Sequence, residues 1–170
     1  MKPILETSRL SIRQFTPEDK PIFMEIEADE RLTKYISRRS QEESEKLFHS
    51  ILHAYDQDEK LGRWGAFDIK TGEFVGICLL APSHYDPSFV ELGYRLHLKF
   101  WGQGLASEMA RALVNYGLKT LRLKEIVAVV DPLNTASERV LLKAGLQPQG
   151  QVFWYNEWLP FYKVVREEEL

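Results

Sequence analysis

The chain has 170 residues, enough for one domain (residues 1–170) whose core needs neither disulfides nor a structural metal. Its 44% hydrophobic and 28% charged residues are typical of a globular protein, and its net charge of −3 argues against electrostatic nucleic-acid binding. We expect neither a signal peptide nor a membrane segment, because no run of about 18 apolar residues occurs.

The N-terminal part of the chain predicts a strand, two helices and a hairpin. Apolar and polar residues alternate from Leu10 to about Phe15, which is typical of a strand. Thr16 and Pro17 then provide a helix start, a capping hydroxyl followed by proline in the first turn. The later patterns predict a helix over Gln41–Asp58 and strands over Trp64–Ile69 and Phe74–Leu80, joined by the turn Lys70–Glu73.

The single cysteine, Cys78, lies in the apolar run Val75–Ala81. It has no partner for an internal disulfide, which fits a reducing compartment such as the cytoplasm. We therefore interpret Cys78 as a buried core thiol and expect a cytoplasmic protein.

The C-terminal part predicts alternating strands and helices. A strand over Phe89–Leu98 precedes an amphipathic helix from Leu105 to about Thr120 and a nearly all-apolar strand over Glu125–Val130. This β-α-β unit predicts a right-handed crossover between parallel strands, with ligands at the carboxyl ends of the strands. The last predicted elements are a helix over Ala136–Ala144, ended by Gly145, and strands over Gln151–Tyr155 and Trp158–Val165.

Two glycines, Gly102 and Gly104, stand between the strand over 89–98 and the helix from 105. Glycine lets backbone N–H groups approach a ligand closely, and a helix N-terminus adds unpaired donors and partial positive charge, a combination that favours phosphate. The motif alone leaves open a tight turn without a ligand, or a dinucleotide site in which Ser107 replaces the third glycine. A P-loop is excluded because no Gly-Lys-Ser/Thr sequence occurs there.

A wider pattern surrounds this turn. It consists of Glu-Leu-Gly-Tyr-Arg-Leu at 91–96, Phe-Trp-Gly-Gln-Gly-Leu-Ala-Ser-Glu at 100–108, and the segment Asn134–Leu146. In this order the segments resemble the GNAT family of acetyl-CoA-dependent N-acetyltransferases. The opening segments 5–13 and 16–19 are similar to the branch that acetylates the N-termini of ribosomal proteins.

The resemblance implies an α+β fold with an α/β-type core. It predicts a mixed, mostly antiparallel, twisted sheet of about seven strands, splayed at its central parallel pair and flanked by about four helices. Acetyl-CoA would be the co-substrate, with its pantetheine arm on unpaired backbone groups in the splay and its pyrophosphate on the glycine turn. Lys99 departs from the family's Gln or Arg, which matters little because most donors are backbone groups. The implied cofactor-binding residues are Leu96, His97, Leu98, Gly102, Gln103, Gly104, Leu105, Ala106, Ser107, Asn134 and Ser137.

The start of the helix near residue 135 has two interpretations. Thr135 and Glu138 have the spacing of a capping box, which would leave the Asn134 amide free for the pantetheine arm, as the resemblance implies. Alternatively, Asn134 itself caps the helix and Ser137 has no role.

Acetyl transfer to an amine needs a base for the amine and a proton or hydrogen bond for the departing thiolate. Glu91 is our candidate base, because it lies on the splayed strand and alternation places it on the side of Arg95. Many relatives carry a tyrosine acid where this chain has Leu141, whereas Ser137 resembles the serine given that role in the ribosomal branch. A backbone N–H near Leu98 would polarise the thioester carbonyl. We expect direct transfer in a ternary complex, without acetylation of the mid-strand Cys78.

The acceptor site is less specified. We expect its walls at Arg31–Ser40 and at the Asn156-Glu157 turn, where Glu157 would bind the amine's charge; Arg38 and Arg39 would contact an acidic group or remain solvated. His49 and His53 are one helical turn apart, but no further ligand completes a metal site, so no metal is expected. About half of the C-terminal aromatics should be core, and the others would line the acceptor pocket or a homodimer contact: Phe153, Trp154, Tyr155, Trp158, Phe161 and Tyr162.

The resulting hypothesis is an N-acetyltransferase that acts on a primary amine, for which a protein N-terminal α-amine is one option. One alternative is a small-molecule enzyme acting on a polyamine, amino acid or antibiotic. The other is a catalytically silent acyl-CoA-binding module, which the missing tyrosine would fit. We expect neither nucleic-acid nor membrane partners.

Overall fold

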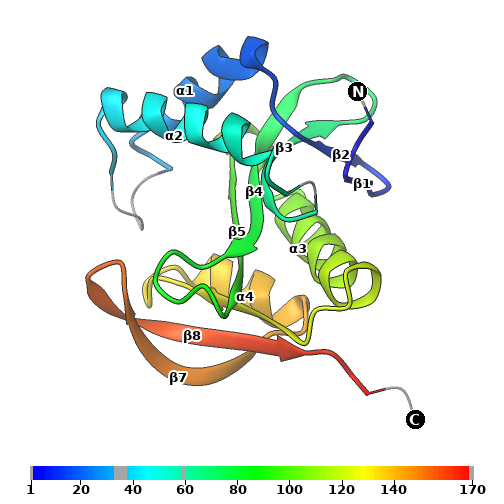
Figure 1. The fold of residues 1–170 in the computed structure, drawn as a ribbon, viewed down its shortest axis with the longest axis vertical. Helices are drawn as coiled ribbons and strands as arrows, with labels where there is room; N and C mark the ends of the chain where they lie inside the picture. Colours follow the sequence, from blue (N-terminus) through cyan, green and yellow to red (C-terminus); the bar gives the residue numbers. More distant parts are fainter. Residues whose placement is uncertain (1, 33–37, 59, 169–170) are drawn as a thin grey trace.

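The computed structural model describes residues 2–32, 38–58 and 60–168. Within these residues, eight strands form one sheet in the order β1-β2-β3-β4-β5-β6-β8-β7 (Figure 1). Neighbouring strands are antiparallel except β5 and β6, which are parallel. The strands are β1 (Leu5–Glu6), β2 (Leu10–Arg13), β3 (Gly62–Asp68), β4 (Phe74–Pro82), β5 (Val90–Leu96), β6 (Glu125–Val129), β7 (Gln147–Trp154) and β8 (Glu157–Val165).

The α-helices pack on opposite faces of this sheet. Successive side chains of β4 point to opposite faces, so Ile77 and Cys78 mark the two sides. Ile77 packs in a cluster with Phe23 and Phe48, whereas Cys78 shares a cluster with Met109. The first face therefore carries α1 and α2, and the second carries α3, with α4 beside it. Their bounds are α1 (Lys20–Ala28), α2 (Gln41–Ala54), α3 (Leu105–Asn115) and α4 (Thr135–Lys143).

The two central strands meet at one place and then diverge. Among the described residues, Glu91 and Val127 are the only register partners across the parallel pair, whereas β5 pairs with β4 along its whole length. The strands β8 and β7, which continue the sheet beyond β6, run across the end of β4 and β5 (Figure 1). The mixed, mostly antiparallel sheet and its splay at the parallel pair are thus confirmed.

Several predicted boundaries were wrong. The sheet has one strand more than the seven expected, because β1 has two residues, too few to show an alternation. The strand expected over 89–98 ends at Leu96, where the Trp101 indole N–H donates to the Leu96 carbonyl (2.9 Å) and a short 3-10 turn, Leu98–Phe100, begins. The helix expected to reach Thr120 is α-helical to Asn115 and then forms one π-helical turn.

Candidate active site

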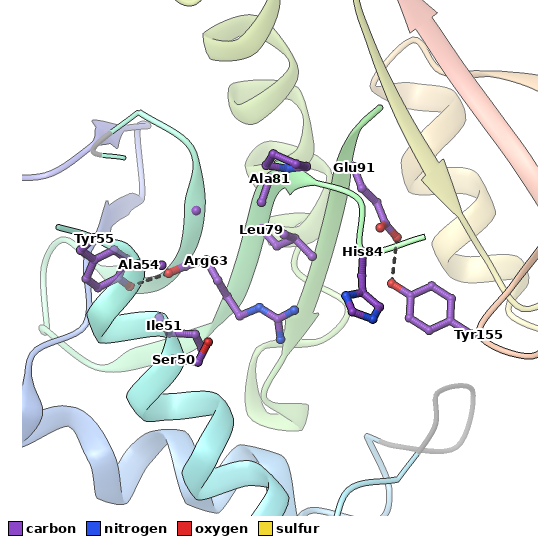
Figure 2. Close-up of a pocket in the computed structure, with 12 residues that line it drawn as sticks. Ser50, Ile51, Ala54, Tyr55, Arg63, Leu79, Ala81, His84, Glu91 and Tyr155 are labelled. Atoms are coloured by element: carbon purple, nitrogen blue, oxygen red, sulfur yellow. Dashed lines mark hydrogen bonds between the residues drawn. The ribbon is translucent and has the colours of Figure 1, made fainter. Parts of the chain in front are cut away.

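A cleft of about 830 Å³ lies where β5 and β6 diverge. Its lining comes from both faces of the sheet, with Ser107 and Ser137 near the starts of α3 and α4 at one end. Arg39 and Arg63 line the other end, on the face that carries α1 and α2. A smaller cavity of about 210 Å³ adjoins that end (Figure 2). The two spaces share Arg63, Leu79, Glu91 and Tyr155.

The glycine turn has the geometry that the sequence predicts. Gly102 and Gly104 adopt φ values of 74° and 76°, the left-handed region that favours glycine. Gly104 is the N-cap of α3, and no side chain of the described residues caps its free N–H groups. The Arg9 guanidinium donates to the Gln103 carbonyl (2.8 Å), which holds the turn in place. Unpaired helix N–H donors beside an open cleft fit a phosphate group.

Glu108, in the first turn of α3, is bound by side chains of the segment that precedes β2. Glu108 accepts hydrogen bonds from Thr7 (2.9 Å), Ser8 (3.1 Å) and the Arg9 guanidinium (3.1 Å). These bonds hold the pKa of Glu108 below its usual value, despite the opposing effect of partial burial. The carboxylate is thereby tied to the start of β2 and paired with a cation, so its charge is offset near the turn.

The register of β5 shows which backbone groups face the splay. The His97 N–H donates to the Val75 carbonyl of β4 (2.8 Å), and backbone groups alternate along a strand. Residues of even number in β5 therefore direct their N–H and C=O groups away from β4. Tyr94 and the N–H of Leu96 face the splay, whereas the Leu96 carbonyl already accepts from Trp101.

The expectation of unpaired backbone groups was wrong for His97 and for the Leu98 carbonyl. The His97 N–H bonds to β4, and its carbonyl accepts from the Phe100 N–H (2.9 Å). The Leu98 carbonyl accepts from the Trp101 N–H (3.1 Å) because the chain curls into the 3-10 turn. Of the residues expected to bind the cofactor, His97, Leu98 and Gln103 do not line the cleft. Those that do line it are Leu96, Gly102, Gly104, Leu105, Ala106, Ser107, Asn134 and Ser137.

At the start of α4, the cap is the one that the alternative interpretation predicts. Asn134 is the N-cap, and its Oδ1 accepts from the Ser137 N–H (3.1 Å). Thr135 and Glu138 therefore do not form a capping box, because Thr135 is already the first residue of the helix. The reason is that the Asn134 N–H donates to the Asp131 carbonyl (2.9 Å), which places this good capping residue one position earlier. The side-chain oxygen of Asn134 is thus engaged within the chain.

Ser137 has a side-chain partner that the sequence analysis missed. The Tyr94 hydroxyl lies 3.0 Å from Ser137 Oγ and 3.1 Å from the Ser137 carbonyl, so its one proton can be donated to either oxygen. Burial raises the pKa of Tyr94 to about 12, partly offset by the bond to Ser137. Leu141, at the position where the family resemblance leads us to expect a tyrosine, is 2% exposed in the core. The hydroxyl pair Tyr94–Ser137 is thus a polar feature of the α3 and α4 side of the cleft.

Glu91 lies on the opposite side of β5, buried at 7% exposure. The Tyr155 hydroxyl donates to Glu91 Oε1 at 3.1 Å (Figure 2). Burial raises the pKa of Glu91 above its usual value, and the bond from Tyr155 offsets part of this rise. Tyr155 and Asn156 both adopt positive φ, 55° and 63°, as the two central residues of the β7–β8 hairpin turn. The turn lies one residue earlier than the Asn156-Glu157 turn expected from the sequence, because β7 ends at Trp154 and Glu157 already belongs to β8.

The other predicted residues have mixed outcomes. Arg31, Arg39 and Glu157 line the cleft, Arg38 pairs with Glu30 at the surface, and positions 33–37 lie outside the described residues.

Cys78 is buried, as expected, and burial raises the pKa of its thiol. Among the described residues, no His, Cys, Asp and Glu side chains form a group of three or more suited to a metal. In the same part of the chain, no helix is long and apolar enough to cross a membrane.

Comparisons with known proteins agree with this geometry. Residues 9–147 match the family described as acetyltransferase (GNAT) domain. The chain is 33% identical to the uncharacterized N-acetyltransferase YoaA of Bacillus subtilis, over 99% of this chain and 100% of that protein. A GNAT-family acetyltransferase structure from Bacillus anthracis aligns with a TM-score of 0.81 at 27% identity, covering 96% and 99% of the two chains. The structure of RimL, a ribosomal L7/L12 α-N-protein acetyltransferase in complex with coenzyme A, shares the fold: TM-score 0.77, 17% identity, 96% and 97% coverage.

The splayed sheet, the glycine turn at the start of α3 and the family match define an acyl-group transferase that uses acetyl-CoA. The chain belongs to the GNAT family and is an acetyl-CoA-dependent N-acetyltransferase.

Proposed function

We propose that the chain joins acetyl-CoA and a primary amine in one ternary complex, from opposite faces of the sheet. The observation that carries this proposal is the splay between β5 and β6, where a single cleft contacts both faces. Glu91 and Tyr94, three residues apart on β5, lie on opposite sides of it. The acetyl donor binds on the side of α3 and α4, and the amine approaches from the side of α1 and α2.

The donor site is built mainly from backbone groups. The N–H groups of Gly104, Leu105 and Ala106 at the uncapped start of α3 hold the pyrophosphate. The dipole contribution at a helix end is about 0.3–2 kcal/mol, so direct hydrogen bonds supply most of the affinity. The peptide groups of β5 that face the splay pair with the amide-rich pantetheine arm as with a neighbouring strand. The backbone groups of Tyr94 and Leu96 therefore bind the pantetheine arm, in place of those of Leu96, His97 and Leu98.

Glu91 acts as the general base. An alkyl amine is mostly protonated at neutral pH, so it must lose a proton before it attacks the thioester. The raised pKa of Glu91 keeps the carboxylate basic, and the hydrogen bond from Tyr155 keeps it ionised and oriented. Cys78 takes no part, because its buried thiol has a raised pKa and lies within β4.

Ser137 supplies a proton or hydrogen bond to the departing thiolate. When the Tyr94 hydroxyl donates to Ser137 Oγ, the serine O–H is free to point toward the sulfur. The pair thus replaces the single tyrosine that the buried Leu141 cannot provide.

The test is release of free thiol from acetyl-CoA in the presence of a panel of amines and peptide N-termini. We expect thiol release that depends on an acceptor, with an equal amount of acetylated product. Tight binding of coenzyme A without thiol release for any acceptor would instead support a silent acyl-CoA-binding module. Acetylation of Cys78 during turnover would contradict direct transfer.

A further inference from the structure

The acceptor end of the cleft contains an unusual concentration of arginine. The sheet register places Arg63 of β3, Leu79 of β4 and Gly93 of β5 side by side on the face that carries α1 and α2. Arg95 follows Gly93 by two residues and points to the same side. Arg39, which precedes α2, completes the group at the cleft wall.

One buried carboxylate holds two of these arginines. Glu27 of α1 has a side chain only 2% exposed; its Oε2 accepts from Arg39 (3.2 Å) and from the Ser44 hydroxyl (3.2 Å), and its Oε1 accepts from Arg95. Even so, the Nε and NH1 groups of Arg95 are buried without a hydrogen-bond partner among the described residues. The cluster therefore has more donors than acceptors.

Arg63 differs from the other two because no carboxylate within residues 2–32, 38–58 and 60–168 forms an ion pair with it. Its guanidinium forms no hydrogen bond or ion pair with any described residue, although it points into the cavity (Figure 2). Burial lowers the pKa of Arg63, and the nearby Arg39 and Arg95 lower it further. A partly buried cation without an ion-pair partner favours a ligand that brings negative charge.

The charges of the neighbourhood indicate how much negative charge is missing. Around Arg63, the guanidinium groups of Arg39, Arg63 and Arg95 outnumber the two buried carboxylates, Glu27 and Glu91, by one. Asp131 and the exposed Glu157 line only the larger cleft and do not border the smaller cavity. Arg31, which also lines the cleft, is held by Asp29 through two hydrogen bonds of 2.8 and 3.0 Å and adds no free cation. A single carboxylate matches this surplus, and its two oxygens fit the donor pair of a guanidinium.

Resting on the proposed function, we propose that the acceptor is a small amine that carries a carboxylate, which binds Arg63 while its amino group lies at Glu91. Both residues line the cavity of about 210 Å³ as well as the larger cleft, so one small molecule spans them. The chemical class is a free amino acid or a longer amino-carboxylate. A polyamine would bring positive charge to a site that already holds a surplus of it.

The test compares matched acceptors with and without the carboxylate: alanine with alaninamide, and 4-aminobutyrate with its carboxamide. Spermidine and peptides with acidic or neutral second residues complete the set. We expect kcat/KM at least tenfold higher for the carboxylate member of one pair. Arg63→Met should reduce that ratio at least tenfold, and dividing by the wild-type ratio removes differences in intrinsic amine reactivity. Arg111→Met, on the exposed side of α3, is the control.

Stability gives a second measurement. If Arg63 serves binding, Arg63→Met leaves the Tm of the acceptor-free protein unchanged or higher, because it removes an unpaired cation. With saturating coenzyme A, the better amino-carboxylate should raise the Tm of the wild type but not of Arg63→Met. Preference for amides, spermidine or peptides, or a ratio unchanged in Arg63→Met, would overturn the inference while thiol release still supports acetyl transfer. A lower Tm in Arg63→Met would assign Arg63 a structural role instead.

Discussion

The Tyr155 hydroxyl and Glu91 Oε1 lie 3.1 Å apart, which joins the β7–β8 hairpin turn to the strand next to the splay. Tyr155 donates and the carboxylate accepts, so the bond stabilises the ionised form of Glu91. The turn that presents Tyr155 has two non-glycine residues with positive φ. Such backbone conformations cost energy and are found often at functional sites.

Tyr155→Phe should shift the acidic limb of the pH–rate profile to higher pH. Loss of the hydrogen bond raises the pKa of Glu91 further, and the base works only above its pKa. We expect kcat on the alkaline plateau to remain close to wild type. Tyr116→Phe, which removes a hydroxyl that donates to the Lys60 carbonyl (2.9 Å), is the control and should leave the limb in place. Equal limbs in both variants would show that Tyr155 does not act on Glu91.

Glu91→Gln should lower kcat/KM by roughly 10²–10⁴-fold at neutral pH, the usual contribution of a general base. The loss should become smaller as pH rises, because solvent then removes the amine proton. Initial rates of thiol release between pH 6 and 10 measure this trend. The surface variant Glu42→Gln, from the exposed pair with Lys46, should behave as wild type. A loss in Glu91→Gln that is constant with pH would contradict the assignment.

Ser137→Ala should lower kcat while the Kd for coenzyme A stays near that of the wild type. Tyr94→Phe should cause a smaller loss, since Ser137 retains its hydroxyl. The two changes should not be additive, because both hydroxyls act on one proton. Steady-state kinetics on both variants and on the double variant, together with calorimetric titration of coenzyme A, measure the coupling. Additive losses would separate Tyr94 from the reaction.

Gly104→Ala should weaken binding of coenzyme A, because φ near 76° strains any other residue and shifts the N–H groups of the turn. The strain costs roughly 1–2 kcal/mol of stability. Gly72→Ala is a matched control: Gly72 has φ of 75°, and an added Cβ would meet no atom within 4 Å. Both variants should lose similar Tm, but only Gly104→Ala should show a higher Kd. Equal Kd values would argue against a pyrophosphate at this turn.

The fold and the glycine turn could be predicted from sequence because their signals are local. Gly102 and Gly104 must be glycine for their φ values, and the motif that contains them is contiguous. The start of α4 was ambiguous, since Asn134 and Thr135 are both good capping residues and a turn bond to Asp131 decides between them. The end of β5 depends on the Trp101 indole, whose contact with Leu96 no periodicity reveals.

The acceptor end could not be predicted, because its residues are distant in the chain. Arg63 and Glu91 become neighbours only through the register of β3, β4 and β5. Tyr155 looked like one of several strand aromatics, of which Trp154 and Tyr162 are indeed core while Phe153 and Trp158 are exposed. Its role follows from the hairpin turn, which reaches β5 across the sheet.

The single register pair of Glu91 with Val127 has a mechanical consequence. It divides the described sheet into a block of five strands and a block of three, β6, β8 and β7. A ligand that bonds to β5 in the splay and also contacts the three-strand block connects the two blocks. Because it binds only the folded protein, its binding raises the free energy of unfolding. Donor binding and tertiary stability are then one linked equilibrium, and amide hydrogen exchange in the three-strand block would report the arrival of the donor.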